Sequence, residues 1–263
     1  MVVFFFVMWS ILSCVLIILV CNSFISITTF LGIWGFISST ILAITIFQIR
    51  RIKKIRCIIS SITSFSRGEP SERDFIYRLV KNGIPASTIF HDLYLPNQHG
   101  HTQVDLVVPT NVGIFVFEIK DYAGWIFGNA NHQKWTQVLA YGDEKHQFYN
   151  PIKQNEGHIT ALRNTSEQLA HIPIYSFVVF YGSCSLRALH NIPQNCWVGH
   201  PRPIIKVLKD IIANTPPAPY TNKWEVISIL KNAVANGCNE EIKDAHLRKV
   251  QTTCAGKYKT TYK

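Results

Sequence analysis

The hydrophobic pattern divides the chain into two parts at residue 49. Residues 1–49 contain no Asp, Glu, Lys or Arg, and they hold two long apolar runs, Val2–Val20 and Ile25–Phe47, separated by the short sequence CNSF. A helix needs about 20 apolar residues to cross a bilayer, and each run comes close to or reaches that length. The first run lacks the basic start and the small-residue cleavage site of a signal peptide. We therefore expect residues 1–49 to form a two-helix transmembrane hairpin.

A cluster of basic residues follows the second apolar run. Arg50–Arg56 has the sequence RRIKKIR, in which five of seven residues are basic. Such a cluster marks the cytoplasmic end of a membrane span. We expect residues 50–67 to be a basic juxtamembrane linker in a multi-pass protein of the cell's inner (cytoplasmic) membrane. Both termini and the soluble domain would then lie in the cytoplasm.

Helical and strand-like patterns alternate in the rest of the chain. A helix starting near Glu72 places Phe75, Ile76 and Leu79 on one face and ends at Gly83. Strand patterns cover residues 86–96, 102–110, 113–120, 125–128, 134–140 and 172–182, and helical patterns cover residues 151–170, 202–213 and 223–237. This order predicts an α/β domain over residues 68–213, with a mixed sheet flanked by helices. Residues 214–263 are expected to form a C-terminal helix and a basic tail.

Three charged residues interrupt the hairpin predicted over residues 102–120. Glu118 and Lys120 are two apart on a strand, so they project from the same face. If the strands pair antiparallel, Asp105 comes opposite Phe117 or Glu118, within reach of that face. Two close carboxylates repel unless a proton or a cation lies between them, and such oxygen ligands suit Mg²⁺ or Mn²⁺. A cross-strand salt bridge on a solvated face is the alternative.

The chemistry of this group and the charge of the chain point in one direction. A divalent ion held by Asp105 and Glu118 could polarise a phosphoryl oxygen and lower the pKa of a bound water. Lys120 could orient that water or neutralise the developing negative charge. The net charge of +10 lies wholly after residue 49, and a basic domain favours polyanions, either nucleic acid or anionic lipid.

Motifs of several other function classes are missing from the sequence. It contains no GxxxxGK[ST], HExxH or GxSxG pattern, so ATP hydrolysis, zinc proteolysis and common serine esterase chemistry lack support. None of the seven cysteines forms a CxxC pair. A zinc ribbon is therefore unsupported, and reduced thiols are expected.

A long central block resembles a known nuclease family. An aspartate followed by ExK on a hairpin, after a helix that bears a glutamate, is similar to the PD-(D/E)XK nuclease superfamily. The segment from about Gly68 to about Leu186 resembles in particular its nuclease-related domain (NERD) family. The residues that carry this resemblance are Gly68, Glu72, Asp105, Gly113, Glu118, Lys120, Tyr122, Gly124, Gly128, Trp135, Asn150, Pro151, Gln154, His158 and Leu162. Ser71 departs from the pattern, because the family usually carries a glycine before its glutamate.

The resemblance implies a fold, an activity and residue roles. The implied fold is restriction-endonuclease-like, and the implied activity is Mg- or Mn-dependent cleavage of nucleic acid, with DNA favoured over RNA. The implied metal ligands are Asp105 and Glu118, with the Ile119 carbonyl as a third, and the implied catalytic residues are Lys120, Glu72 and Gln154.

Alternatives stay open for several residues and for the whole protein. Glu72 could be a solvated charge near a helix start, and His158 could be a hydrogen-bonded packing residue. His91, His99 and His101 are expected in a solvated loop. A catalytically silent nucleic-acid-binding or scaffolding module is the alternative to a nuclease. A third possibility is a basic protein that binds anionic lipid through RRIKKIR alone.

Overall fold

The structure is a computed structural model of the chain, and it describes residues 10, 14, 15, 17, 18, 26–64, 66–98 and 100–259. The chain divides into two compact units, Met1–Cys57 and Ile58–Lys263. The first predicted span, Val2–Val20, and the turn after it lie outside the described residues except at five isolated positions. The first half of the predicted hairpin therefore stays a prediction.

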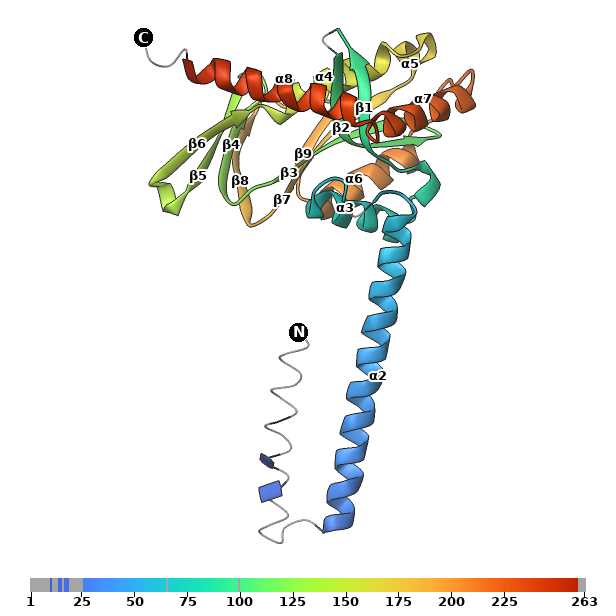
Figure 1. Cartoon of the computed structure of the whole chain (residues 1–263), viewed down its shortest axis with the longest axis vertical. Coiled ribbons are helices and arrows are strands. Elements are labelled where there is room, and N and C mark those ends of the chain that lie inside the picture. Colours follow the sequence, from blue (N-terminus) through green and yellow to red (C-terminus); the bar gives the residue numbers. More distant parts are fainter. Residues whose placement is uncertain are drawn as a thin grey trace. The chain divides into compact units, whose positions relative to one another are not determined.

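One long helix, α2 (Ile27–Ser60), holds most of the second predicted span and the basic cluster (Figure 1). Among the described residues it is the one helix that is long and apolar enough to cross a membrane, judged by length and composition. At 1.5 Å per residue its length is about 50 Å. Residues 50–60 are helical rather than a linker, because neither Gly nor Pro occurs between Gly35 and Gly68 to end the helix.

A five-stranded mixed sheet forms the centre of the second unit. Its order is β1-β2-β3-β7-β9, with antiparallel pairing from β1 to β3 and parallel pairing from β3 to β9. The strands are β1 (Phe90–Asn97), β2 (Gly100–Thr110), β3 (Gly113–Asp121), β7 (Ile174–Tyr181) and β9 (Cys196–Gly199). β2 and β3 form the predicted hairpin, and β7 is the predicted buried strand.

Helices cover both faces of this sheet. On one face lie α3 (Pro70–Lys81) and α6 (Pro201–Asn214), and on the other lie α4 (Pro151–Arg163), α5 (Glu167–His171) and α7 (Lys223–Asn236). The predicted face of α3 supplies Phe75, Ile76 and Leu79, all fully buried in the first layer. The prediction of a mixed sheet flanked by helices is confirmed. The helix expected over residues 151–170 is divided into α4 and α5 by the polar residues Asn164–Ser166.

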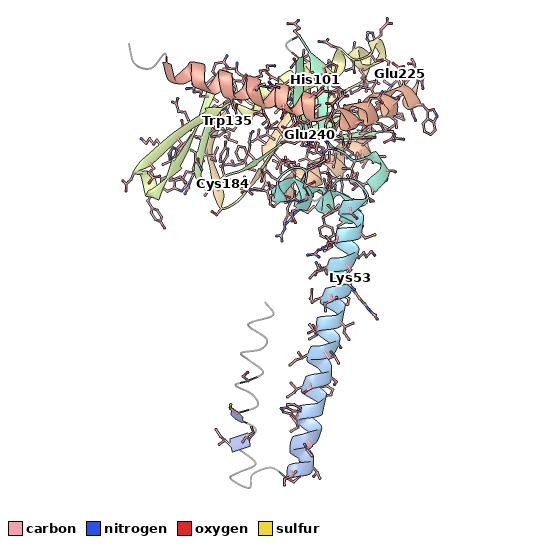
Figure 2. The ribbon with its side chains drawn as sticks, in the orientation of Figure 1. Lys53, His101, Trp135, Cys184, Glu225 and Glu240 are labelled. Atoms are coloured by element: carbon pink, nitrogen blue, oxygen red, sulfur yellow. The ribbon has the colours of Figure 1, made fainter. Side chains whose placement is uncertain are left out.

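The structure has two sheets where the sequence pattern predicts one. The second sheet has the order β6-β5-β4-β8. Its strands are β4 (Gly124–Asn129), β5 (Lys134–Leu139), β6 (Glu144–Tyr149) and β8 (Cys184–His190). One face of it is buried, and there Trp135, labelled in Figure 2, stacks on Phe180 of β7 with a ring distance of 6.1 Å. Tyr141 lies in the short 3-10 turn Ala140–Gly142 between β5 and β6.

The C-terminal segment holds a second helix after α7. This helix, α8 (Glu240–Lys259), contacts β2, and His246 Nδ1 donates to the carbonyl oxygen of His101 at 3.2 Å; Figure 2 labels His101 and Glu240. Asn239 accepts the backbone N–H of Glu241 at 2.9 Å and so caps the helix start. The described residues after Asn239 are therefore helical rather than an extended tail.

At the same point along their length, the alternation of side chains between the two faces of the first sheet is broken in both β1 and β2. Phe90 and Leu93 are three apart yet pack in the same core cluster, whereas residues at an odd spacing on a regular strand point to opposite faces. Asp92 between them has a left-handed backbone, with φ of 55°. Two valines around Asp105 on β2, also three apart, share this cluster. Asp105 therefore lies where the strand pair changes face.

Candidate active site

The candidate site lies at the end of β3, where Glu118 and Lys120 point toward α4. Lys120 Nζ lies 2.5 Å from Glu118 Oε1 and donates to Gln154 Oε1 at 3.1 Å. Glu118 is fully buried, whereas Lys120 keeps some exposure. Gln154 is held in place because the Asn150 side chain accepts from Ile152 N at 3.0 Å and fixes the first turn of α4. Two elements far apart in the sequence thus meet at one ion pair.

His158 joins this group from the next turn of α4. Its Nε2 lies 3.0 Å from Glu118 Oε2, and its Nδ1 lies 3.0 Å from Thr102 Oγ1. The side chain is buried, but against a charged group rather than in an apolar core. The spacing of four residues from Gln154, which places both on one helix face, is the signal in the sequence that points to this contact.

The charges of this group favour an ion pair. Burial by itself would raise the pKa of Glu118, but Lys120 and His158 outweigh it and the pKa is lowered. Burial would likewise lower the pKa of Lys120, but the negative charges of Glu118 and Asp105 raise it. Glu118 is therefore ionised and Lys120 protonated at neutral pH.

Asp105 lies just beyond the last regular pair of the hairpin, Leu106 with Phe117. Its Oδ2 accepts the backbone N–H of Ile119 at 2.7 Å. The N–H and C=O groups of one strand residue point to the same side, so the Ile119 carbonyl also faces β2. The side chain of Asp105 comes close to the opposite position predicted from the sequence.

The carboxyl group of Asp105 has an unfavourable environment for its charge. Burial raises its pKa well above the ordinary value, and the negative charges of Glu118 and Glu72 raise it further, against a smaller opposing effect of Lys120. A carboxyl group of this kind takes up a proton or attracts a cation.

Glu72 comes from α3, on the opposite face of the sheet from His158. Its Oε2 lies 2.7 Å from His91 Nε2, and His91 Nδ1 lies 2.7 Å from Thr63 Oγ1. Gly68 has φ of 64°, and a Cβ there would collide with the Glu72 and His91 side chains. The glycine that opens the GEPSE sequence is thus required by the packing of this pair.

The solvated environments considered for Glu72 and His91 are both wrong. The two side chains are buried because each is the hydrogen-bond partner of the other across the contact between α3 and β1. His101 is half-buried under α8, while His99 lies outside the described residues. The sequence around His91 gives no signal that this histidine has a buried glutamate as its partner.

A further carboxylate in this region, Asp92, has its own cation. Arg67 Nε lies 2.7 Å from Asp92 Oδ2, and Gln103 donates to Asp92 Oδ1 at 2.8 Å. Arg67 also donates to the backbone oxygen of Asp92 at 2.7 Å, which holds the left-handed residue in place. Asp92 therefore needs no further positive charge.

The structure joins the predicted site residues by contact or by charge. Contacts link Glu118, Lys120 and Gln154, while Asp105 interacts through charge with Glu118, Lys120 and Glu72. In the part of the chain that the structure describes, no group of three or more His, Cys, Asp or Glu side chains is arranged to hold a metal ion. The donors still fit a hard cation such as Mg²⁺, which commonly takes one or two carboxylates and keeps several waters.

Two comparisons with known proteins found matches. An uncharacterised protein from Bacillus anthracis is 32% identical over 126 residues, which cover 47% of this chain and 57% of that protein. The chain thus spans little more than half the length of this relative. No solved structure matches.

The other match is to a family. Residues 67–181, somewhat less than half of the chain, match the family model of the nuclease-related domain (NERD). The matched segment runs from Arg67 to the last residue of β7 and contains Glu72, Asp105, Glu118, Lys120 and Gln154. The candidate site therefore lies entirely within the part of this chain that is similar to the nuclease-related domain.

Proposed function

We propose that this protein is a metal-dependent nuclease that hydrolyses phosphodiester bonds of nucleic acid, with DNA favoured over RNA. The observation that carries the proposal is the position of Asp105 beside the carboxylates Glu118 and Glu72. Three carboxylates in a mostly buried site call for a cation, and Lys120 offsets the charge of only two of them, Glu118 and Asp105. The match to the nuclease-related domain supports the reaction class.

Asp105 and Glu118 would hold a Mg²⁺ or Mn²⁺ ion, with the Ile119 carbonyl on the same side of β3. When bound, the ion would polarise the phosphoryl group and make a bound water more acidic. Each oxygen of Glu118 accepts one hydrogen bond and keeps a second lone pair, so its contacts with Lys120 and His158 leave it able to ligate.

The remaining residues act on the substrate or on the ligands. Lys120 stays protonated and can neutralise the charge that develops on a phosphoryl oxygen. Gln154 accepts from Lys120 and keeps its ammonium group directed at the site. His158 and Thr102 orient the carboxylate of Glu118 through their chain of hydrogen bonds.

We propose further that the enzyme works at the cytoplasmic face of the inner membrane. The apolar part of α2, with the basic cluster at its end, supports one membrane span. The apolar run Val2–Val20 would supply the second span of the hairpin. Nucleic acid would then be cleaved close to the membrane surface.

The test is cleavage by the full chain in detergent or in lipid nanodiscs. Labelled single-stranded and duplex DNA and RNA are incubated with Mg²⁺, Mn²⁺ or EDTA, beside the Lys120→Met variant. We expect cleavage that needs the metal and is lost in the variant, while metal binding persists because lysine is no ligand for a hard cation. Equal cleavage in EDTA would contradict the metal requirement.

The catalytically silent binding module is a second candidate, favoured by one observation. Both oxygens of Glu118 already have protein partners, and Asp105 favours its protonated form, so the group could persist without a metal. Melting temperatures separate the two candidates. A nuclease is stabilised by millimolar Mg²⁺ or Mn²⁺ through Asp105, whereas a silent module melts at the same temperature with and without the ions and cuts none of the substrates.

A further inference from the structure

The second sheet is inserted between two residues of the candidate site. The chain leaves the site after Lys120, forms β4, β5 and β6, and returns at Gln154 on α4. Lys120 and Gln154 are hydrogen-bonded to each other, so both ends of this excursion are fixed at the site. The β4–β6 strands and β8, which pairs with β4, extend from this point (Figure 1). The second sheet is therefore joined to the candidate site at both ends of β4–β6.

The two faces of the second sheet differ in what covers them. The inner face carries Ile126, Trp135 and Phe148, which pack with Phe180 in a core cluster. The outward face carries the residues of opposite parity. Directly paired residues share a face, and the pairs Trp125 with Val138, Val138 with Lys145, and Lys134 with Tyr149 assign these side chains to the outward face.

Among the described helices, α4 places Ile152 in the core cluster on the inner face of this sheet, and no helix makes extensive contact with its four strands. Instead the helices pack on strands of the first sheet. The exposed residues on the outward face include Lys134, Lys145 and Arg187, and Tyr149 is 44% exposed. Apart from Val138, which is buried, the face is thus open to a partner from solution.

The outward face combines positive charge with aromatic rings. Its described residues include three cationic side chains, Lys134, Lys145 and Arg187, and none of its described residues is acidic. Its rings are Trp125 and Phe127 on β4 and Tyr149 on β6, and β5 lies between these two strands. A polyanion that also offers flat apolar surfaces complements this composition.

One contact on this face already shows the geometry of stacking. The guanidinium carbon of Arg187 lies 5.1 Å from the centre of the Trp125 ring. Arg187 is the extra residue at a register shift between β4 and β8, since Ile126 pairs with Leu186 and Phe127 with Ala188. The shift turns Arg187 over Trp125, and planar bases stack on arginine and on aromatic rings in the same manner.

We propose that the outward face of the second sheet binds single-stranded nucleic acid and delivers it to the candidate site. That the ligand is nucleic acid rests on the proposed function, whereas the preference for a single strand rests on the residues of this surface. Base faces are accessible to aromatic rings only in an unpaired strand, because stacking hides them in a duplex. A membrane surface fits less well, because Trp125 and Phe127 are half-buried in the sheet rather than projecting into a lipid layer.

Binding of fluorescein-labelled oligonucleotides to the full chain in neutral nanodiscs tests the proposal. Anisotropy is measured in EDTA, so that cleavage plays no part, with 20-mers of dT, of rU and of a matched duplex. We expect tighter binding of the single strands than of the duplex. Trp125→Ala should weaken single-strand binding about tenfold, since stacking of a base on an aromatic ring is worth about 1–3 kcal/mol.

Two further variants guard against a loss of folding. Lys145→Gln and Arg187→Gln change exposed side chains, and together they should flatten the slope of log Kd against log salt by about 1.4, or about 0.7 for each lost phosphate contact. The matched controls are Trp224→Ala and Lys231→Gln on α7, which also change exposed residues and should leave binding unchanged.

The outcomes separate this proposal from the proposed function. Metal-dependent cleavage with single-strand binding that is unchanged in Trp125→Ala and in the double variant would overturn the surface and leave the nuclease intact. Binding that depends on Trp125 without any cleavage would support the surface and contradict the nuclease. Preference for the duplex would overturn the proposal. So would capture on phosphatidylglycerol vesicles that depends on Arg187 while oligonucleotides do not bind.

Discussion

Two hydrogen-bonded chains of side chains, each made of a threonine, a histidine and a glutamate, lie on opposite faces of the first sheet. On the α4 face, Thr102 contacts His158, which contacts Glu118. On the α3 face, Thr63 contacts His91, which contacts Glu72. In both, Nδ1 of the histidine meets the threonine and Nε2 meets the glutamate.

The two chains differ in how the carboxylate charge is balanced. Glu118 also has Lys120, and its pKa is lowered. Glu72 meets a histidine and adds its negative charge to Asp105. The comparison teaches that a neighbouring cation distinguishes the Glu118–His158 pair, which lies in the proposed active site, from the Glu72–His91 pair. We therefore expect the Glu118 chain to govern activity and the Glu72 chain to govern stability.

The largest expected effect is on cleavage. Glu118→Gln removes a proposed ligand and should lower kcat/KM for metal-dependent cleavage by more than about 100-fold, whereas Glu72→Gln, an outer residue, should lower it by about tenfold. The two substitutions are chemically identical and each is a control for the other. Equal losses would mean that the two chains do not divide activity and stability as proposed.

The next effect is on stability. His91→Ala leaves the buried Glu72 without its partner and should lower the free energy of unfolding by about 1–3 kcal/mol. His158→Ala should cost less, because Glu118 keeps Lys120. Thermal unfolding of the full chain in detergent, followed by tryptophan fluorescence, measures both. A larger loss in His158→Ala would reverse the comparison.

Replacing Asp105, which lies between the two chains, should raise the free energy of unfolding rather than lower it. Its folded pKa is raised, so the folded state binds the proton more tightly than the unfolded state does, and the ionised form costs stability as pH rises. Asp105→Asn should raise the free energy of unfolding at neutral pH by on the order of 1 kcal/mol, with a smaller gain in mild acid. Melting curves at two pH values check this prediction, and destabilisation at neutral pH would contradict it.

The smallest expected effect concerns His246 on α8, which lies near His158 of the Glu118 chain. Burial lowers the pKa of His246; its hydrogen bond to the His101 carbonyl opposes this, and the charges of Lys249, His158 and His101 add smaller contributions that lower the pKa further. A depressed histidine pKa means that the unfolded form binds more protons, so the attachment of α8 should weaken as pH falls below the ordinary pKa of 6.5. The protection factors of the α8 amides, which are exchange rates corrected for the intrinsic effect of pH, should therefore fall in acid, and His246→Phe should abolish that dependence. Unchanged acid sensitivity in the variant would contradict the assignment.

The first sheet, apart from its short edge strand β9, and its helices were predictable because their patterns are strong. α3, α6, the hairpin and β7 each show a clear helical or strand period, and the charges of the hairpin interrupt it visibly. β6 and β8 were missed because both are largely exposed or half-buried and lack an apolar alternation. The division into two sheets depends on which strands pair, and no local pattern specifies that.

Only those parts of the site that residue type and spacing along the chain indicate could be predicted. Asp105, Glu118 and Lys120 could be grouped from strand geometry, and Gln154 from the family resemblance. The burial of His91 could not, because its glutamate partner comes from another element, whereas a hydrogen-bonded His158 was among the alternatives that the sequence left open. The face change at Asp92 and Asp105 also escapes prediction, since an aspartate with positive φ has no distinctive sequence signal.

The layered packing of the first sheet has a consequence for how the protein can be produced. The segment that matches the nuclease-related domain ends at Tyr181, but α6 fills one face of the sheet and α7 the other, and β9 completes its edge. Arg67, at the start of that segment, donates to the carbonyl oxygen of Val234 on α7. A recombinant fragment cut to residues 67–181 would keep α3, α4 and α5 but expose the parts of both apolar faces that α6 and α7 cover, and it would leave an unpaired strand open to other chains. The smallest piece of this chain that expresses as a soluble protein should therefore extend through α7, well beyond the segment that sequence similarity delimits.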